Sequence, residues 1–251
     1  MREGLSALIK KDYPGRVIII GRGKSRDSVL VCYAITGRSS SSQARKLVRE
    51  GDTIWVRPEE GAIAGGDPEL LVYPAICLSR GLVVGNGRQI LDIKDALSSS
   101  ENPAEILARA LSKWSYEPDS PIYTPRITGC VLSQRLAALS IIKRGRDGSP
   151  LRNIFEVPLR EARGWMISTY QGESRETLVP FSGEPEELSL EAEGSRESAE
   201  AVYEALGPDD GKKDLRVAVA CVVCSDFKSG AFDISIINRE EKRGSHHGKN
   251  R

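Results

Sequence analysis

The stretch RVIIIGRGKSRDSVLVCYAIT, residues 16–36, decides the fold. It holds two apolar runs rich in β-branched residues, at 16–20 and 28–36, and a polar segment with two glycines separates them. Apolar runs of this length, bounded by turn-forming residues, are typical of buried strands. The stretch therefore predicts two buried strands in a largely antiparallel sheet.

Outward from this stretch, strand patterns recur along most of the chain. Predicted helices are few: a short one at 3–10, one at 103–114 and one at 195–206. Asn102 is a suitable N-cap for the second of these, and a proline follows in its first turn. Many strands and few helices predict a layered α+β fold. The further predicted strands are 53–57, 70–77, 81–85, 88–93, 127–132, 138–143, 152–158, 164–170, 215–224 and 231–238.

The length of 251 residues is close to the upper size for one hydrophobic core, so we expect a single domain over 1–240. Residues 241–251 have almost no apolar side chains and cannot bury enough surface to offset the entropy cost of ordering. They are predicted to form a disordered polar tail. The acidic segment at 182–206 is typical of a solvated outer layer.

The balance of charges limits the classes of partner. There are 36 Lys and Arg against 35 Asp and Glu, so the totals do not indicate a nucleic-acid-binding surface, and any basic site must be local. No apolar run approaches the roughly 20 residues that span a bilayer, and the first residues lack the pattern of a signal peptide. We therefore expect a cytoplasmic protein that binds neither nucleic acid nor membranes.

Cysteine and histidine chemistry is predicted to be absent from the folded body. His246 and His247 lie in the polar tail, so neither a Ser-His-Asp triad nor an imidazole zinc site is expected. The five cysteines are an odd number, and most lie in apolar runs, so we expect small buried hydrophobes and no structural disulfide. Cys221 and Cys224 have zinc-knuckle spacing, but in a strand they point to opposite faces. No metal site is predicted.

Residues 33–45, YAITGRSSSSQAR, run from an apolar strand into a glycine, two arginines and a row of hydroxyls. Arginine forms bidentate, charge-assisted bonds to phosphate, and hydroxyls add neutral donors. The segment predicts a phosphate-binding loop, and the alternative is a serine-rich turn with solvated arginines. The segment GRGKS at 21–25 completes neither a dinucleotide-binding nor a Walker motif. It is either a turn or a loop in which Arg22 contacts an anion.

Four further segments add to the loop at 33–45. They are DYPGRVIIIGRG at 12–23, VVGNG at 83–87, YEPDSPIYTPRITG at 116–129 and WMISTYQGE at 165–173. In this order they resemble the archaeal-type IMP cyclohydrolases and their bacterial relatives, over residues 12–240. The resemblance implies an α+β fold of the N-terminal-nucleophile-hydrolase-like class, a four-layer αββα sandwich of two mostly antiparallel sheets.

The resemblance also implies an activity, the dehydrative ring closure of 5-formamidoimidazole-4-carboxamide ribonucleotide to inosine monophosphate (IMP) in de novo purine biosynthesis. Both reacting groups lie on one ring, and well-oriented intramolecular reactions reach effective molarities of about 10⁵–10⁸ M. Such an enzyme is expected to need a small purine ribonucleotide substrate, no cofactor and no metal. Homo-oligomers are compatible with the family.

Residues that match the motifs of the family form the candidate site. Proton transfer or orientation of the reacting groups is assigned to Tyr73 and Glu117, and the oxyanion or formyl group to Arg45 or Arg22. The arginine-serine loop is assigned to the phosphate, and the remaining candidates to the ribose, base or carboxamide. The catalytic candidates are Tyr73, Glu117 and Arg45, and the substrate-binding candidates are Arg22, Arg38, Ser39, Ser42, Asn86, Tyr123 and Arg126.

Several candidates have a purely structural alternative. Tyr73 is alternatively a core aromatic residue, and Glu117 a solvated helix terminus. Asn86 precedes a glycine, which is the strongest short-range signal for a hairpin turn. Arg126 has many carboxylates with which it can pair.

The sequence departs from the family in one residue and from the usual hydrolase chemistry of the fold in another segment. Many relatives carry an asparagine where this chain has Ala44, so a substrate contact is either missing or replaced by Gln43. Residues 1–3 offer no Cys, Ser or Thr behind the initiator methionine, so no free N-terminal nucleophile is expected. Three alternatives stay open: an amidohydrolase of the same fold, a non-catalytic nucleotide-binding protein, and a relative that acts on another purine-pathway intermediate.

Overall fold

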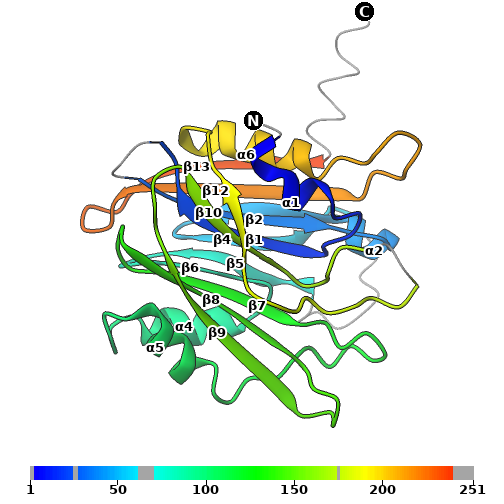
Figure 1. Ribbon diagram of the computed structural model, residues 1–251, viewed down its shortest axis with the longest axis horizontal. Helices are drawn as coiled ribbons and strands as arrows, with labels where there is room; N and C mark the ends of the chain where they lie inside the picture. The colour runs from blue at the N-terminus through cyan, green and yellow to red at the C-terminus, as the bar shows by residue number, and fades with distance from the viewer. Residues whose placement is uncertain (1–2, 25–27, 62–70, 174–175, 240–251) are drawn as a thin grey trace, which may run out of the picture.

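The computed structural model describes residues 3–24, 28–61, 71–173 and 176–239. Two antiparallel sheets are stacked face to face, and helices lie on their outer faces (Figure 1). From one side of the molecule to the other, the layers are helices, a six-stranded sheet, a seven-stranded sheet and helices. The predicted α+β class with two antiparallel sheets is confirmed.

The six-stranded sheet has the order β11-β10-β1-β2-β12-β13, and all neighbouring strands are antiparallel. The stretch at 16–36 supplies the two central strands, as its apolar composition predicts. The strands are β1 (Arg16–Arg22), β2 (Val29–Thr36), β10 (Arg163–Ser168), β11 (Glu186–Ser189), β12 (Arg216–Asp226) and β13 (Ala231–Asn238).

The seven-stranded sheet is a meander in which each strand pairs antiparallel with the next in sequence. Short connections favour the pairing of β3 with β4, β5 with β6, β7 with β8 and β8 with β9, because a tight turn returns the chain beside the strand that it has just left. Longer segments, residues 59–72 and 86–125, connect the other neighbours. The strands are β3 (Arg45–Glu50), β4 (Thr53–Pro58), β5 (Tyr73–Leu78), β6 (Leu82–Gly85), β7 (Arg126–Val131), β8 (Leu136–Arg144) and β9 (Pro150–Pro158).

Helices cover each sheet from outside. The turn η1 (Glu3–Leu5), α1 (Ser6–Ile9) and α6 (Gly194–Ala205) lie on the six-stranded sheet, and α4 (Gln89–Ala96) and α5 (Pro103–Ala110) lie on the seven-stranded sheet. The predicted N-cap of α5 is confirmed, because Asn102 Oδ1 accepts hydrogen bonds from the N–H groups of residues 104 and 105. The short helix α2 (Ser40–Gln43) lies at one end of the sandwich.

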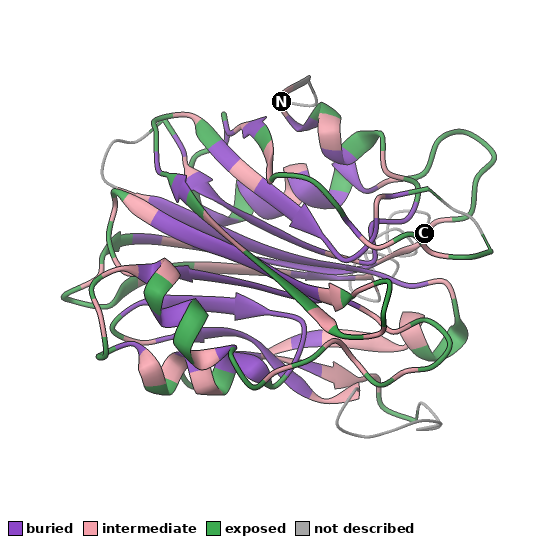
Figure 2. Ribbon diagram, turned by 60° about the horizontal axis from the view of Figure 1, so that its bottom comes forward, coloured by how far each residue is buried: buried purple, intermediate pink, exposed green. Residues whose placement is uncertain are grey.

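Successive side chains of the central strands point to opposite faces of the six-stranded sheet, so each strand contributes to two separate parts of the core. In β1, Ile18 and Ile20 face the other sheet, while Val17 and Ile19 face α1 and α6. All four are at most 1% exposed, and each fully buried aliphatic side chain contributes roughly 1.5–3 kcal/mol. Figure 2 shows the buried residues concentrated in the strands at the centre of the molecule.

The predicted strand at 88–93 is wrong, because these residues begin α4. A short apolar run can belong to either kind of element, and here Ile90, Ile93 and Leu97 recur at helical spacing and pack on the sheet. Strands β3 and β11 were not predicted, because each lies at a sheet edge and has few apolar residues. The predicted tail at 241–251 lies outside the described residues.

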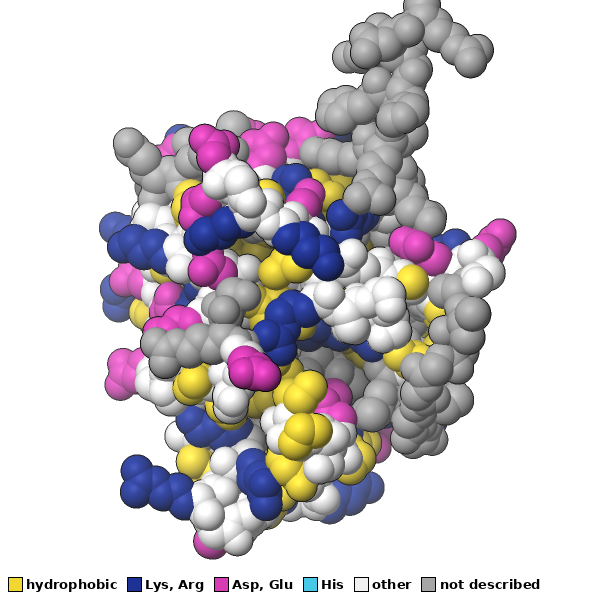
Figure 3. All heavy atoms as spheres, turned by 90° about the vertical axis from the view of Figure 1, so that its right-hand side faces the viewer, with side chains coloured by type: hydrophobic (Ala, Val, Ile, Leu, Met, Phe, Trp, Pro, Cys, Tyr) yellow, Lys and Arg dark blue, Asp and Glu magenta, His cyan; other side chains and the backbone are white. Residues whose placement is uncertain are grey.

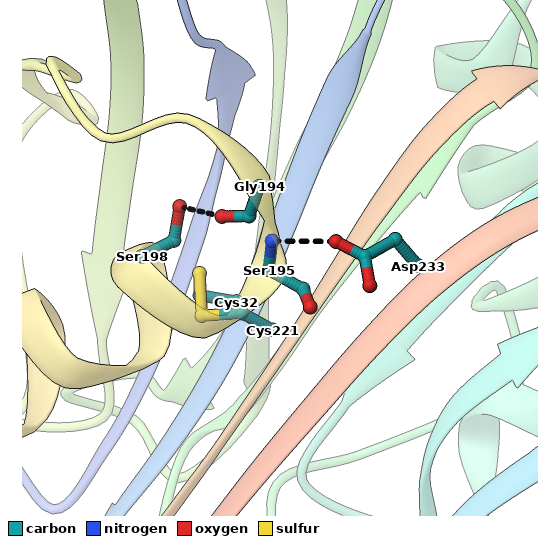
Figure 4. Close-up of a disulfide and its surroundings, with 6 residues drawn as sticks. All are labelled: Cys32, Gly194, Ser195, Ser198, Cys221 and Asp233. Atoms are coloured by element: carbon teal, nitrogen blue, oxygen red, sulfur yellow. Dashed lines mark hydrogen bonds between the residues drawn. A yellow bond between two sulfur atoms is a disulfide. The ribbon is translucent and has the colours of Figure 1, made fainter.

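A disulfide joins Cys32 in β2 to Cys221 in β12, so the prediction that no disulfide forms is wrong. The two cysteines are 189 residues apart in sequence, but the pairing of β2 with β12 places them directly opposite each other. The bond lies beneath the first turn of α6 (Figure 4). Cys221 and Cys224 do face opposite sides of the sheet, as the strand spacing predicts.

Within the described part of the chain, no helix has both the length and the apolar character needed to cross a membrane.

Candidate active site

A pocket of about 320 Å³ opens at the end of the sandwich where β1 begins and β2 ends. Small-molecule sites typically have volumes of about 300–1,000 Å³. Figure 3 shows this end of the molecule, with basic side chains near its centre among hydrophobic and uncharged groups. The lining residues are Tyr13, Arg16, Arg38, Ser39, Ser41, Ser42, Arg45, Leu71, Tyr73, Asn86, Glu117, Asp119, Ile122, Thr124, Tyr170 and Leu178.

Tyr73, the first residue of β5, belongs both to the core between the sheets and to the pocket lining. Its hydroxyl oxygen accepts a hydrogen bond from Arg16 Nε at 3.3 Å and lies 3.0 Å from the hydroxyl of Tyr33. Arg16 also donates through Nη1 to the carbonyl of Thr36 at 3.3 Å. The phenol is thus held by groups from the opposite sheet, and the alternative of a core aromatic residue describes only part of its environment.

Arg16 is held in place at the start of β1. Burial by itself lowers the pKa of Arg16, but the neighbouring Tyr73, Tyr33 and Tyr13 raise it well above its ordinary value. The guanidinium therefore stays positively charged at the floor of the pocket.

Glu117 lies in the loop after α5, and its side chain is only 12% exposed. The loop is fixed by a hydrogen bond from the N–H of Glu117 to the carbonyl of Thr124 at 2.9 Å. Arg126 Nη1 lies 3.6 Å from Glu117 Oε1, which is too long for a hydrogen bond. Burial raises the pKa of Glu117 to about 7, and the charge of Asp119 adds to this rise while nearby arginines oppose it.

This environment gives Glu117 the character of a proton carrier. A carboxyl group with a pKa near neutrality can both accept and return a proton at the pH of the cell. The alternative of a solvated helix terminus does not describe it, because the side chain is nearly buried and turned into the pocket.

Arg45, the first residue of β3, also lines the pocket. Its Nε is buried and has no hydrogen-bond partner among the described residues. Burial lowers the pKa of Arg45, and the charge of Arg16 lowers it further. A buried donor without a partner costs free energy, so this N–H group suits an acceptor that a ligand brings.

The arginine-serine loop forms one wall of the pocket, as the positions of Arg38, Ser39 and Ser42 show. Ser39 is the N-cap of α2: its Oγ accepts from the N–H of Ser42 at 3.1 Å and lies 2.7 Å from the Oγ of Ser42. Arg38 lies over the ring of Tyr13, with Cζ 4.9 Å from the ring centroid. Gln43 is turned away, because its Nε2 donates to the carbonyl of Gly37.

A second wall is built from residues that sequence reasoning missed. Asp119 accepts hydrogen bonds from both the N–H and the hydroxyl of Thr124, and that hydroxyl lies 3.0 Å from the hydroxyl of Tyr170. Tyr170 stacks on Tyr13 at a centroid distance of 5.7 Å. Aromatic and hydroxyl groups therefore line the pocket together with Glu117 and Tyr73, where they can contact a planar ring.

Asn86 and Arg126 are largely occupied by the protein. Asn86 Nδ2 donates to the carbonyl of Pro125, and its Oδ1 accepts from the N–H of Ile127, both at 2.8 Å. Asn86 thus ties β6 to β7, although it also lines the pocket. Arg126 donates to Gln89 Oε1 and to the carbonyl of Ser115, both at 3.0 Å, and lies behind Glu117 rather than in the lining.

Tyr123 and Arg22 are not brought to the pocket. The ring of Tyr123 packs edge-on against Tyr116, and Arg144 lies over it with Cζ 4.1 Å from the centroid. Arg22 is at the far end of β1 from Arg16, six residues along a strand that rises about 3.3 Å per residue, so the two lie roughly 20 Å apart. Arg22 is therefore too far away to contact the oxyanion or any other part of a ligand in this pocket, contrary to the prediction.

The signals for the missed residues were weak. Arg16 belongs to the segment at 12–23 that carries the family resemblance, but a charged residue before an apolar run is also an ordinary strand start. Tyr33 lies inside an apolar run and is indistinguishable there from a core aromatic residue. Only the stacking of the two sheets brings its hydroxyl to Tyr73.

Comparisons with known proteins identify relatives over most of the chain. A family model described as "IMP cyclohydrolase-like protein" matches residues 13–226. The IMP cyclohydrolase of Methanothrix thermoacetophila is 32% identical over 160 residues, which are 63% of this chain and 74% of that protein. The IMP cyclohydrolase of Natronomonas pharaonis is 28% identical over 183 residues, 71% of this chain and 84% of that protein.

Proposed function

Because this chain belongs to the IMP cyclohydrolase-like family, we propose that its pocket closes the second ring of the purine in IMP. The enzyme is an IMP cyclohydrolase of purine biosynthesis, and we assign 5-formamidoimidazole-4-carboxamide ribonucleotide as its substrate. The observation that carries the proposal is Glu117, a nearly buried carboxyl group with a pKa of about 7 in a pocket that also holds Tyr73 and Arg45.

The walls of the pocket suit the parts of a purine ribonucleotide. We assign the phosphate to the loop with Arg38, Ser39 and Ser42, because it joins a positive charge to hydroxyl donors. The imidazole ring is assigned to the space lined by Tyr73, Glu117 and the wall with Thr124 and Tyr170. Its carboxamide and formamide groups then lie against these proton carriers, and the reacting nitrogen and carbon are held in one conformer.

In the first step, the carboxamide nitrogen attacks the formyl carbon. The new C–N bond forms as the C=O π bond breaks. Glu117, ionised, takes a proton from the attacking nitrogen, and Tyr73 gives its hydroxyl proton to the formyl oxygen. The tyrosinate that results is stabilised by the hydrogen bond from Arg16. The unpartnered Nε of Arg45 is the donor that we assign to the formyl oxygen as its charge develops.

In the second step, water leaves. The protonated Glu117 gives its proton to the hydroxyl on the former formyl carbon, and the C–O bond breaks. The nitrogen that came from the formamide loses its proton to the tyrosinate as the C=N bond of the purine forms. Both side chains return to their starting states, so the sum is one substrate converted to IMP and one water.

Three finer assignments belong to the same proposal. We propose that the fold belongs to the N-terminal-nucleophile-hydrolase-like class, because two stacked antiparallel sheets between helical layers are the architecture of that class. We also propose that the enzyme acts in the cytoplasm, where purine nucleotides are made. No cofactor or metal is needed for the two steps above, and assembly into homo-oligomers stays a prediction from the resemblance.

The test is to mix the purified protein with 5-formamidoimidazole-4-carboxamide ribonucleotide, without metal or cofactor, and to follow IMP by absorbance and chromatography. We expect IMP at catalytic rates, and a strongly raised KM in Arg38→Ala. The matched control is Arg80→Ala, which removes an exposed arginine that pairs with Glu101 on the surface. IMP formation no faster than the uncatalysed reaction would refute the proposed function.

A further inference from the structure

Two tyrosine hydroxyls meet between the sheets behind the pocket. Tyr33 extends from β2 and Tyr73 from β5, and their oxygens are 3.0 Å apart. Tyr33 is completely buried and Tyr73 is 2% exposed. Of the two, only Tyr73 lines the pocket. Tyr33 thus has no contact with the pocket space except through the hydroxyl of Tyr73.

The direction of the hydrogen bond between these hydroxyls follows from what else each oxygen contacts. The Tyr73 oxygen already accepts from Arg16 Nε at 3.3 Å, because a guanidinium has only donors. Among the described residues, the Tyr33 hydroxyl has Tyr73 as its one hydrogen-bond partner. If Tyr73 were the donor, the proton of Tyr33 would have no acceptor in a completely buried place.

A buried donor without an acceptor costs free energy, because it loses its hydrogen bond to water and gains none in the protein. With Tyr33 as donor this cost is absent, and the hydroxyl proton of Tyr73 is left to point into the pocket. Tyr33 is also suited to remain a donor. Burial and the neighbouring Tyr73 raise the pKa of Tyr33 well above its ordinary value, so its hydroxyl keeps its proton.

We propose that Tyr33 is a positioning residue that donates its hydroxyl proton to Tyr73 and so directs the proton of Tyr73 toward the substrate. The assignment rests on the proposed function. Tyr33 and Arg16 together place two donors on one phenol oxygen, the arrangement that stabilises a tyrosinate. Tyr73 can then give up its proton to the formyl oxygen and recover one when water leaves.

The first test is Tyr33→Phe, which keeps the buried ring and removes the hydroxyl. We expect kcat to fall by about 10-fold while KM changes by less than about 3-fold, since a lost hydrogen bond to a developing charge affects chemistry more than binding. Tyr203→Phe is the matched control, because Tyr203 is a buried tyrosine of α6, 4% exposed, that packs in the core between α6 and the six-stranded sheet, away from the pocket. Thermal unfolding of each variant shows that it is folded.

The second test separates positioning from a general loss of packing. In a Tyr73→Phe background the hydroxyl on which Tyr33 acts is gone, so adding Tyr33→Phe should lower kcat no further. Two independent, multiplying losses in the double variant would overturn the proposal, and so would a Tyr33→Phe enzyme with wild-type kcat. If wild-type protein forms no IMP, the proposed function fails as well, and the two failures are thereby distinguished.

Discussion

Glu117 holds a carboxyl group where its negative charge is disfavoured. Burial dominates the rise of its pKa to about 7, although several arginines lie nearby. The arginines lower this pKa only in part. Arg126 Nη1 is 3.6 Å from Glu117 Oε1, and Arg126 donates its hydrogen bonds to Gln89 and Ser115 instead. A tight ion pair with Arg126 would fix Glu117 in its ionised form and remove its value as a proton carrier.

The first prediction concerns the pH dependence of turnover. Glu117 acts as a base in the first step, so kcat/KM should rise with pH and level off above about pH 7, because kcat/KM reports the pKa of the free enzyme. Initial rates of IMP formation between pH 5 and pH 8.5 measure this rising limb, because the range extends to both sides of the Glu117 pKa of about 7. A rate that falls through the same range would mean that Glu117 must be protonated to act.

Glu117→Gln should lose this limb together with about 10²–10⁴-fold in kcat, the usual contribution of a positioned acid or base. Its control is Glu200→Gln on the outer face of α6, where the side chain is 46% exposed and its carboxylate pairs with Arg196 four residues away. A Glu117→Gln enzyme with the pH profile of the wild type would assign the limb to another group.

The second prediction is that Glu117 decreases stability at neutral pH. The pKa of Glu117 is raised from 4.5 in the unfolded chain to about 7 in the folded state. Below pH 4.5 the group is protonated in both states and costs no stability. As pH rises through about 7 the buried carboxyl group must ionise, and the free energy of unfolding falls. Glu117→Gln should therefore raise the free energy of unfolding above pH 7, by up to about 3 kcal/mol, and change it little near pH 4. Urea unfolding at both pH values measures this. A variant destabilised at both would show that the carboxyl group is stabilised where it lies.

At the scale of elements, the pocket depends on where the strands end. β1 begins at Arg16, β3 at Arg45 and β5 at Tyr73, so three functional side chains stand at first strand residues. Strand ends are the places where a regular ladder holds the backbone while the side chain remains accessible. Among these strands, β3 is an edge strand, and its position relies on contacts beyond its single sheet partner.

The third prediction concerns such a contact. The side-chain amide of Asn238, at the end of β13, makes two hydrogen bonds to the backbone of Leu47 in β3. Asn238 Oδ1 accepts from the N–H of Leu47 at 2.8 Å, and Asn238 Nδ2 donates to the carbonyl of Leu47 at 3.1 Å. It thus joins edge strands of the two sheets. Asn238→Ala should lower the free energy of unfolding by about 1–3 kcal/mol, because two backbone groups lose partners in a buried place.

Thermal or urea unfolding of Asn238→Ala, beside the exposed control Asn153→Ala, measures the effect. We also expect a lower kcat/KM, because β3 carries Arg45 into the pocket. Stability equal to that of the wild type would mean that the β3 edge is satisfied without Asn238.

Elements with strong apolar patterns were predictable, and those defined by their neighbours were not. Residues 231–238 form β13 with the predicted limits, and the capping signal of Asn102 located the start of α5. The run at 88–93 was assigned to a strand because six residues are too few to separate a helical from a strand period. Edge strands such as β3 have few apolar residues, and only pairing with β4 makes them strands.

The same distinction applies to the site. Arg38, Ser39, Ser42, Arg45, Tyr73, Asn86 and Glu117, all predicted from motif residues, lie in one pocket. The structure added Arg16, Tyr33 and Asp119, whose positions depend on how the two sheets stack and how the loop after α5 folds back. Tyr123 belongs to a motif segment but its ring points elsewhere, because a motif fixes the backbone path and not each side-chain direction. Arg22 lies at the end of β1 far from the pocket.

At the scale of the whole molecule, the pocket lies at the mouth between two sheets. Arg16 and Tyr33 come from the six-stranded sheet, and Arg45, Tyr73 and Asn86 from the seven-stranded sheet or its ends. The core between the sheets therefore fixes the distances within the site. The disulfide between Cys32 and Cys221 lies in the six-stranded sheet, one residue from Tyr33.

The fourth prediction concerns this disulfide. It links positions 189 residues apart, and closing so long a loop restricts the unfolded chain, which stabilises the fold by about 2–5 kcal/mol. A reductant that opens it should lower the Tm of the wild type and leave the Tm of the double variant Cys32→Ser, Cys221→Ser unchanged. Equal effects of reductant on both proteins, or none on the wild type, would contradict a stabilising disulfide.

The most direct measurement of the central claim is a crystal structure of the protein with IMP bound. We predict that the phosphate lies against Arg38, Ser39 and Ser42, and that the closed ring lies within hydrogen-bonding distance of Tyr73 and Glu117. IMP bound at another surface, or in this pocket with its base directed away from Tyr73 and Glu117, would contradict the claim that ring closure takes place here.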